Sequence, residues 1–381
     1  MPRVLCIVGT RPEVVKMAPV VRRLKESKDI DSILMLSGQH RELVRAALGQ
    51  FGLRADEDLD LMEPNQSLDR LTSRAFDRLG ERLRTLRPDL VLAQGDTTTV
   101  MVAAVACFYA GIPFGHVEAG LRTGDLRNPF PEEFNRVVAG RVATLHFAPT
   151  EAAGRALMKE GVRPESIVVT GNTVIDSLAD SVSRVAASAH EPGAGQRLVL
   201  MTSHRRENFG EPMRRSFEVI RDIVATRPDL HLLYPVHPNP NVRGVAEEVF
   251  ANAERILLID PLDYLPFVAA MKAAYVIVTD SGGVQEEAPF LSKPVLVLRD
   301  VTERPEAVSA GVARLVGTDG ESLAAALSEL LDDASAYGRM AAGGSPYGDG
   351  KASLRIVQRL RTFLGLPLEE PPLAPFGRAD G

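Results

Sequence analysis

The sequence predicts an α/β protein made of two doubly wound, Rossmann-like domains. Its 381 residues exceed the size at which a single hydrophobic core stops growing, so two domains are expected. Short β-branched and aliphatic runs alternate with helix-periodic segments, the pattern of parallel strands joined by crossover helices. A stretch of small residues with Pro and Gly, 185–196, indicates a linker. We therefore expect domains at 1–184 and 197–350.

The first half contains five expected strands, each a short apolar run that ends at a polar turn. Pro12 falls in the first turn of the helix after the first strand, where its missing N–H costs nothing. The expected strands are 4–8, 32–37, 89–93, 112–117 and 143–147, and the expected helices include 40–50, 67–86, 97–109, 150–160 and 172–187.

A second α/β series follows the linker. Its expected strands are 198–202, 230–235, 255–259, 275–279 and 294–298. A helix at 351–365 is expected to return to the first domain. The Pro-rich segment 366–381 is expected to be a loose tail.

The composition is that of a soluble protein with no electrostatic preference for nucleic acid or membrane. There are 44 basic and 50 acidic residues, for a net charge of −6. Cys6 and Cys107 lie in apolar segments and are expected to be buried thiols, which fits a cytoplasmic location. The apolar stretch near 100–115 is too short for a membrane span, and the chain does not open with a secretory signal. The seven histidines show no HxH or HxxxH spacing, so no metal is expected.

Carboxylates and cations gather at the strand ends of the first half, where ligands of open α/β sheets bind. Asp96, Glu118 and Glu132 are the candidate acids, and Arg11 and Lys16 the candidate cations. Four of these five residues have a simpler interpretation. Asp96 is placed to cap a helix, Glu132 suits a helix start, and the two cations suit a solvated surface.

In the second half, a turn of Ser281, Gly282 and Gly283 lies between a buried strand and a helix. Bare backbone N–H groups at a helix start suit a phosphate, although an ordinary Gly-rich turn would read the same way. Glu287 lies where a carboxylate could accept hydrogen bonds from ribose hydroxyls, and Arg304 follows the next strand.

Two histidines close strands of this half. His204 opens the segment HRREN, and His237 lies in PVHPNPN, which its prolines stiffen. A structural or surface role is the simpler interpretation of His204. For His237, fixing the loop and contacting a ligand are equally good interpretations.

Several long motifs together resemble one family. They are GTRPE (9–13), HVEAGLRTGD (116–125), HRREN (204–208) and DSGGVQEEAPFLSKPVLVLRDVTERPEA (280–307). These are similar to the non-hydrolysing UDP-N-acetylglucosamine 2-epimerases, from the first strand to about residue 365. The resemblance implies a glycosyltransferase-B architecture, in which two Rossmann-like domains face each other across a cleft. It also implies a UDP-sugar substrate and a homodimer.

The resemblance implies roles for the candidate residues. Asp96, Glu118 and Glu132 converge beside the sugar, and His204 reaches the diphosphate and the reacting sugar. The loop at 261–267 resembles a uracil-binding loop, with Phe267 beside the base. The expected substrate-binding set is Arg11, Lys16, Phe267, Ser281, Gly282, Gly283, Glu287 and Arg304.

This set of residues suits epimerisation at C-2 of the sugar. The C-2 proton is not acidic in the ground state, and the chain has no GxGxxG turn for a dinucleotide, so no cofactor is expected. Breaking the C-1 bond to the diphosphate first, through a glycal, requires carboxylates at the sugar and cations at the diphosphate. The alternatives are a glycosyltransferase of the same fold and a hydrolysing epimerase that releases UDP and N-acetylmannosamine. A non-catalytic nucleotide-sugar sensor would require the loss of acids that are all present.

A second, activating site for UDP-N-acetylglucosamine occurs in many bacterial relatives, and Gln39, His40 and Arg41 match its core. This chain has Glu42 where those relatives tend to have glutamine, and Asn65 where they tend to have arginine. Each difference weakens a pocket for a second diphosphate. We therefore expect weak or absent activation by the substrate.

Overall fold

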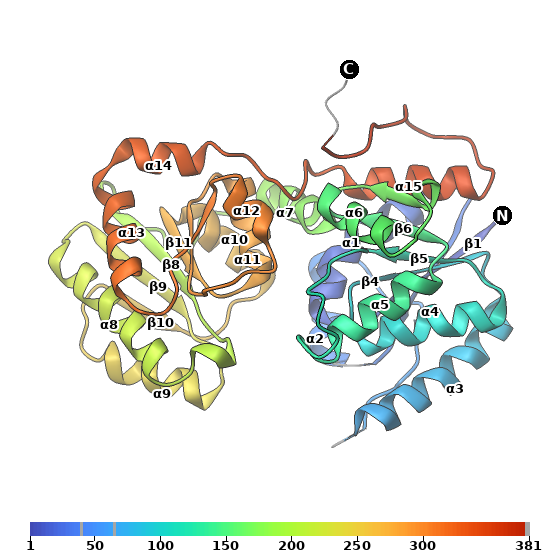
Figure 1. The fold of residues 1–381 in the computed structure, drawn as a ribbon, viewed down its shortest axis with the longest axis horizontal. Coiled ribbons are helices and arrows are strands. Elements are labelled where there is room, and N and C mark those ends of the chain that lie inside the picture. Colours follow the sequence, from blue (N-terminus) through green and yellow to red (C-terminus); the bar gives the residue numbers. More distant parts are fainter. Residues whose placement is uncertain (39–40, 64–65, 378–381) are drawn as a thin grey trace. The chain divides into compact units, whose positions relative to one another are not determined.

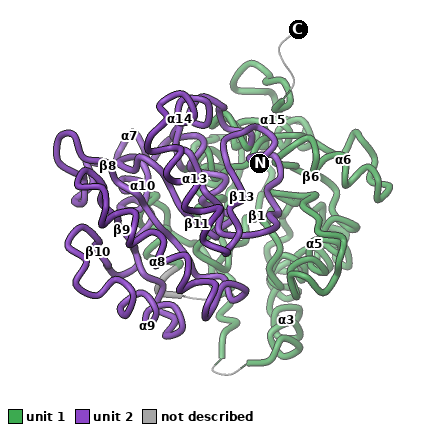
Figure 2. The backbone as a smooth tube through the Cα atoms, turned by 60° about the vertical axis from the view of Figure 1, so that its left-hand side comes forward, with its two compact units in different colours: residues 1–177, 347–381 green, residues 178–346 purple. Residues whose placement is uncertain are grey.

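The structure is a computed structural model that describes residues 1–38, 41–63 and 66–377 (Figure 1). The chain divides into two compact units, coloured separately in Figure 2. Unit 1 comprises residues 1–177 and 347–381, and unit 2 comprises residues 178–346. The expected boundary at residue 184 differs from this division because α7 (Thr173–Arg184) is one unbroken helix that begins in unit 1.

Unit 1 is built on a parallel sheet with the strand order β3-β2-β1-β4-β5-β6-β7. This order is typical of a doubly wound fold, in which the connections run both ways from the central strand. Its strands are β1 (Arg3–Val8), β2 (Asp31–Leu36), β3 (Glu57–Asp58), β4 (Leu90–Gln94), β5 (Phe114–Val117), β6 (Leu145–Ala148) and β7 (Ile167–Val169).

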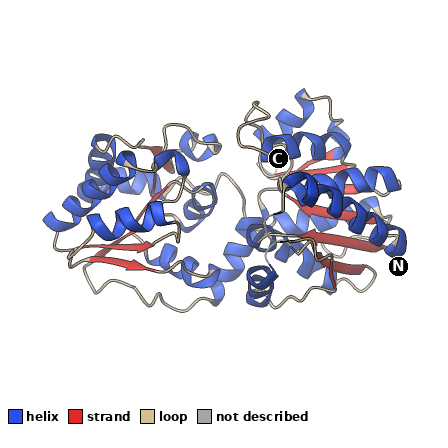
Figure 3. Cartoon of the chain, turned by 90° about the horizontal axis from the view of Figure 1, so that it is seen from below, coloured by secondary structure: helices blue, strands red, loops and turns tan. Residues whose placement is uncertain are grey.

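Helices cover both faces of the sheet of unit 1 (Figure 3). They are α1 (Arg11–Glu26), α2 (Arg41–Gln50), α3 (Leu68–Leu86), α4 (Thr98–Ala110), α5 (Glu132–Val142), α6 (Glu151–Lys159), the first part of α7, and α15 (Ala352–Phe363), with a 3₁₀ turn η1 (Pro164–Ser166). The central strands are buried on both faces, so all residues of β4, and those of β1 after Arg3, are buried. Their register places the polar residues that follow each strand at one edge of the sheet.

Unit 2 repeats the same arrangement. Its parallel sheet has the order β10-β9-β8-β11-β12-β13. The strands are β8 (Arg197–Thr202), β9 (Leu230–Pro235), β10 (Ile256–Ile259), β11 (Val276–Thr279), β12 (Val295–Val297) and β13 (Ala313–Leu315). The helices are α8 (Glu211–Thr226), α9 (Pro240–Val249), α10 (Tyr264–Ala273), α11 (Gly282–Glu287), α12 (Pro305–Ser309), α13 (Glu321–Asp332) and α14 (Ala334–Ala341), with 3₁₀ turns η2 (Arg206–Asn208) and η3 (Ala288–Leu291).

The predicted fold class is confirmed, since each unit is an α/β body on a doubly wound parallel sheet. Three short strands were missed in the sequence: β3, β7 and β13. Each has two or three residues and lies at or beside a sheet edge, so its apolar run is too short to form a pattern.

The C-terminal segment differs from the loose tail that the sequence suggested. α15 packs against α1 in unit 1, and the chain beyond it is held by side chains of α15. Arg355 donates to the Ala374 carbonyl at 2.8 Å, and Gln358 donates to the Pro371 carbonyl at 2.7 Å. The Phe376 backbone N–H donates to Val169 of β7 at 2.8 Å. A Pro-rich composition predicts little regular structure, and it does not forbid such anchoring.

Within the parts of the chain that the structure describes, no helix is long and apolar enough to cross a membrane.

Candidate active site

Two neighbouring strands of unit 1 bring Asp96 and Glu118 to one edge of the sheet. β4 and β5 run parallel, with Gln94 opposite Val117. The Gly95 N–H continues the ladder by donating to the Val117 carbonyl at 3.0 Å. Asp96 and Glu118 follow directly, so the strand register sets both carboxylates at the carboxyl ends of adjacent strands. This edge is where an open α/β sheet binds its ligand.

Glu118 has an unusual backbone and a fully partnered carboxylate. Its φ of +63° lies in the left-handed region, which costs a non-glycine residue about 1–2 kcal/mol. The residue is 8% exposed. Lys16 Nζ donates to Oε1 at 2.7 Å and to Oε2 at 2.8 Å. Strain of this kind is retained where the surroundings fix one conformation, and it is common at functional sites.

Lys16 itself comes from the second turn of α1, whose start is organised by a buried carboxyl group. Thr10 and Glu13 form a capping box, and Glu13 Oε2 also accepts from the Gly9 N–H. Burial raises the pKa of the Glu13 carboxyl to about 7, against the hydrogen bonds from Gly9, Thr97 and Thr10, which lower it. Arg11 is the first residue of α1, at the same junction, and is half-buried.

Asp96 does not cap α4, so the capping interpretation is wrong. α4 begins at Thr98, and the Thr97 hydroxyl accepts from the Val100 N–H as the cap. The Asp96 carboxylate instead accepts from Arg136 Nε at 2.9 Å and Nη2 at 2.7 Å. Its side chain remains 30% exposed, so one side of the carboxylate is open to solvent. Arg136, from α5, was missed in the sequence as a site residue, although it follows the two acids at the start of α5 by about one turn.

The two acids at the start of α5 have different roles. Glu133 is 1% exposed, and its carboxylate accepts from the Thr123 and Gly124 N–H groups at 2.9 and 3.1 Å and from Arg136 at 3.0 Å. It therefore fixes the loop after β5. Glu132 is half-buried, and among the described residues its carboxylate has no recorded hydrogen bond or ion pair. Two cis peptide bonds, before Pro129 and Pro131, shape the segment that leads to it.

His116, which the sequence did not single out as a site residue, contacts the turn that follows β4. Its Nε2–H donates to the Gly95 carbonyl at 2.7 Å, and the ring is fully buried. Burial lowers the pKa of His116 to about 4, so the imidazole is neutral at neutral pH. A neutral ring is suited to holding the Gly95–Asp96 turn and adds no charge to the acid cluster.

In unit 2 a buried carboxylate anchors the loop after β8. Asp280 follows β11, is 0% exposed, and accepts from the Ser203 hydroxyl and from the His204 and Arg205 N–H groups, all at 2.9 Å. Asn208 adds a bond at 3.2 Å. Because β11 pairs with β8, this carboxylate ties together the ends of two central strands.

Asp280 also faces the ring of His204, whose Nδ1 lies 3.3 Å from Oδ1. The His204 ring stacks on His237, with centroids 5.6 Å apart and an interplanar angle of 20°. Burial lowers the pKa of His204, and the Asp280 charge opposes that shift. The His237 Nδ1 accepts from the Asn239 N–H at 3.2 Å, which supports the loop-fixing interpretation of that residue.

Two guanidinium groups border the Ser281–Gly283 turn. A Cβ atom placed on Gly282 would meet the Arg304 guanidinium at 3.7 Å and Arg205 Nη2 at 4.0 Å. Arg304 is held by Glu286, whose Oε1 accepts from Nε at 2.5 Å. The absence of a side chain at Gly282 therefore leaves bare backbone beside two cations, an arrangement that suits an anion. Arg205 was not among the expected binding residues, although its place in HRREN could have suggested it.

The remaining expected residues of unit 2 lie near the same strand ends. Glu287, at the end of α11, accepts from the Tyr264 hydroxyl at 2.7 Å and is 6% exposed. Phe267 is half-buried on α10, one turn after Tyr264. The ribose interpretation of Glu287 and the base interpretation of Phe267 remain predictions.

The side chains of the residues expected to form a second, activating site are not described by the structure. Gln39 and His40 lie outside the described residues, as does Asn65, and the side chain of Arg41 at the start of α2 is not described. Within the described ranges, no group of three or more His, Cys, Asp or Glu side chains is arranged to hold a metal ion.

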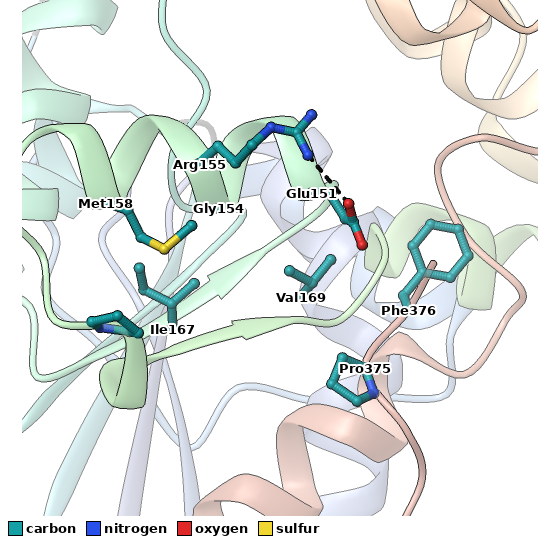
Figure 4. A pocket seen from close by; sticks show the side chains of 9 residues that line it. Glu151, Gly154, Arg155, Met158, Ile167, Val169, Pro375 and Phe376 are labelled. Atoms are coloured by element: carbon teal, nitrogen blue, oxygen red, sulfur yellow. Dashed lines mark hydrogen bonds and ion pairs between the residues drawn. The ribbon is translucent and has the colours of Figure 1, made fainter. Parts of the chain in front are cut away.

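A surface pocket of unit 1, drawn in Figure 4, lies away from the expected site residues. Its volume is about 480 Å³, and it contains none of the candidate acids or cations. It is lined by Glu151, Gly154, Arg155, Met158, Pro164, Ile167, Val169, Pro375 and Phe376.

Comparisons with known proteins agree on one family. The family described as UDP-N-acetylglucosamine 2-epimerase matches residues 22–361. The UDP-N-acetylglucosamine 2-epimerase of Bacillus subtilis is 47% identical over 97% of this chain and 97% of that protein.

Solved structures are similar over nearly the whole chain. A UDP-N-acetylglucosamine 2-epimerase from Neisseria meningitidis, solved with UDP-GlcNAc bound, is 41% identical with a TM-score of 0.87, covering 94% of this chain and all of that one. An S. aureus protein solved with UDP is 42% identical with a TM-score of 0.89, covering 98% of this chain and 99% of that one.

Proposed function

The chain belongs to the UDP-N-acetylglucosamine 2-epimerase family, and from that premise we propose that it inverts C-2 of UDP-N-acetylglucosamine by elimination and re-addition of UDP. The product is UDP-N-acetylmannosamine, and the reaction is reversible. The observation that carries the proposal is the acid cluster at the β4–β5 edge, where Asp96, Glu118 and the start of α5 meet.

Each step of this route conserves atoms and charge. The bond from C-1 to the diphosphate oxygen breaks, and its electron pair leaves with UDP. The oxocarbenium-like sugar then loses its C-2 proton to a carboxylate and becomes a glycal. A carboxylic acid returns a proton to the opposite face of C-2, and the diphosphate oxygen attacks C-1 again. The sum is an isomerisation that consumes nothing.

Unit 1 supplies the acid–base groups for this route. Asp96 and Glu118 each lie against a cation, Arg136 and Lys16, which stabilises a carboxylate able to accept a proton. Glu132 stands at the start of α5 with no recorded partner among the described residues, which suits a group that gives or receives the second proton.

Unit 2 supplies groups for a nucleoside diphosphate. Arg304 and Arg205 border the bare backbone of Gly282, and His204 is oriented by Asp280. Cations and N–H donors that are already in place hold the charged diphosphate both in the bound substrate and in the departing UDP. Glu287 and Phe267 are proposed to contact the ribose and the uracil.

Proton NMR of the purified protein with UDP-N-acetylglucosamine alone in heavy water tests the function. We expect UDP-N-acetylmannosamine to appear, and both sugars to carry deuterium at C-2 as equilibrium is approached. Epimerisation with full retention of the original hydrogen would contradict the elimination route. Free UDP with free N-acetylmannosamine as the main product would identify a hydrolysing enzyme, and dependence on an added acceptor would identify a glycosyltransferase.

We also propose that the chain works as a homodimer in the cytoplasm. Phe108 and Tyr109, at the end of α4, are 64% and 78% exposed, and contact with a second copy would remove this apolar surface from water. Light scattering after size-exclusion chromatography should give twice the mass of one chain. A monomeric mass at working concentration would contradict the dimer.

A further inference from the structure

The carboxylate of Glu118 is held by two neutral amides in addition to Lys16. Asn172 Nδ2 lies 3.4 Å from Oε1, and Gln94 Nε2 donates to Oε2. We propose that Asn172 and Gln94 are positioning residues that hold the Glu118 carboxylate in the orientation it needs for proton transfer. Lys16 is then the donor that gives up its hydrogen bond when the Glu118 carboxylate is protonated. This inference rests on the acid–base role of Glu118 in the proposed function.

The orientation of the Asn172 amide follows from its other contacts. Asn172 precedes α7, and its Oδ1 accepts from the Val174 N–H at 3.1 Å. Its backbone N–H donates to the Tyr347 carbonyl at 2.6 Å, which joins it to the segment that leads into α15. With the oxygen engaged at the helix start, the NH₂ group is turned toward Glu118. The residue is 3% exposed, so water does not compete for this donor.

Gln94 approaches the other oxygen from the strand. It is the last residue of β4, it is 4% exposed, and its backbone is paired with Val117, the residue before Glu118. The donor and its acceptor therefore sit on adjacent, hydrogen-bonded strands. The sheet therefore fixes the backbone position of Gln94 relative to that of Glu118.

Together these donors leave no free lone pair in the plane of the carboxylate. Oε1 accepts from Lys16 and Asn172, and Oε2 accepts from Lys16 and Gln94. A carboxylate offers about four acceptor positions, so protonation of Glu118 requires one donor to withdraw. Lys16 has a long flexible stem and is 14% exposed in its side chain, whereas Asn172 and Gln94 are 3% and 4% exposed, and the Asn172 amide is also held by the Val174 N–H. Lys16 is therefore the donor that can withdraw.

The test exchanges the Asn172 donor without removing its contact at the start of α7. In Asn172→Asp the carboxylate still accepts from Val174 but places a second negative charge against Glu118. Asn172→Ser keeps a hydroxyl at the helix start and removes the donor without adding charge. Asp333→Asn is the control, because Asp333 is an exposed N-cap of α14 in unit 2 and undergoes the reverse exchange, from carboxylate to amide.

We expect both Asn172 variants to lose kcat by roughly tenfold to a hundredfold, the effect typical of an outer residue that orients a functional group. KM should stay close to that of the parent. In Asn172→Asp alone, the acidic limb of the pH–rate profile should move to higher pH, because two carboxylates in contact resist ionising together. Asp333→Asn should match the parent in rate and profile.

A folded Asn172→Asp with the kcat and pH profile of Asp333→Asn would overturn the proposal. Should the Asn172 variants fail to fold, Gln94→Leu tests the proposal instead. It removes the second amide donor to Glu118, and the same loss of kcat is expected. Glu118→Gln is measured in parallel. If it keeps the parent rate, the proposed role of Glu118 fails. If it is inactive while the Asn172 and Gln94 variants are normal, only the present inference fails.

Discussion

The two units share a strand order and use their strand-end carboxylates in opposite ways. In unit 1, Asp96 and Glu118 pair with the cationic side chains of Arg136 and Lys16, and Asp96 stays 30% exposed. In unit 2, the corresponding carboxylate of Asp280 is fully buried and occupied by backbone N–H groups and neutral side chains. A carboxylate that holds a loop cannot also exchange protons with a ligand. In the proposed function, the same fold thus gives one unit for proton transfer and one for holding an anion.

The cations differ in the same way. Arg136 and Lys16 face acids proposed to react, whereas Arg304 faces Glu286, whose side chain is 2% exposed and serves to aim the guanidinium. Arg205 lies beside the same glycine, with its Nη2 4.0 Å from the position that a Cβ atom on Gly282 would take. Substitutions in unit 1 should therefore act on kcat, and substitutions in unit 2 should act on KM.

The largest expected effect comes from the acids of unit 1. Glu118→Gln, Asp96→Asn and Glu132→Gln should each lower kcat by about 10²–10⁴-fold, the usual contribution of a positioned acid or base. Thermal melting should show that each variant is folded. A variant with near-parent kcat and an unchanged melting curve would show that its residue has a structural role and takes no part in proton transfer. The difference proposed between the two units would then be smaller.

The next effect concerns the stability of unit 1 and its dependence on pH. The pKa of Glu13 in the folded protein is about 7, raised above its ordinary value of 4.5 by burial. The folded state therefore keeps a proton that the unfolded state loses. The stability from Glu13 is complete below pH 4.5 and is lost as the pH rises through 7, a change of about 3 kcal/mol.

Glu13→Gln, neutral at every pH, removes this dependence. The melting temperature of Glu13→Gln relative to the parent should rise between pH 5 and pH 8. His116 acts with the opposite sign, since its pKa is lowered to about 4 and its contribution is lost as the pH falls below 6.5. It is present in both proteins and cancels in the difference. A difference that is constant or falls with pH would show that Glu13 is ionised in the folded state.

A smaller effect is expected at the anion site of unit 2. Glu286→Gln keeps the shape of the side chain but gives the hydrogen bond from Arg304 a neutral amide oxygen as acceptor, which weakens this charge-assisted bond. Such a bond is worth about 1.5–3 kcal/mol, so losing part of it should raise KM by up to roughly tenfold. kcat should change little. A variant with lowered kcat and unchanged KM would place Glu286 among the reacting groups and break the division of labour between the units.

The sequence predicted the central strands and the strand-end motifs because long apolar runs and Gly-rich turns are local signals. It missed partners that come from elsewhere in the chain. Arg136 reaches Asp96 across 40 residues, and Asn172 reaches Glu118 across 54. The left-handed backbone of Glu118 was also missed, because positive φ is expected of glycine and not of glutamate. Such features depend on which strands become neighbours, and no local pattern encodes that.

The smallest expected effect concerns the C-terminal segment, where the sequence suggested a loose tail. The Phe376 ring is half-buried with its centroid 5.8 Å from the Arg355 guanidinium carbon, and the Phe376 backbone N–H donates to the Val169 carbonyl. Phe376→Ala keeps the backbone bond and removes the ring, at a cost of about 1 kcal/mol from the cation–π contact and buried area. Leu368→Ala is the matched control, because that side chain is 38% exposed in the same segment. Phe376→Ala should lower the melting temperature of the protein by a few degrees more than the control, with kcat and KM unchanged. Equal melting curves for the two variants would show that the ring contributes nothing to holding the segment and would support the loose tail.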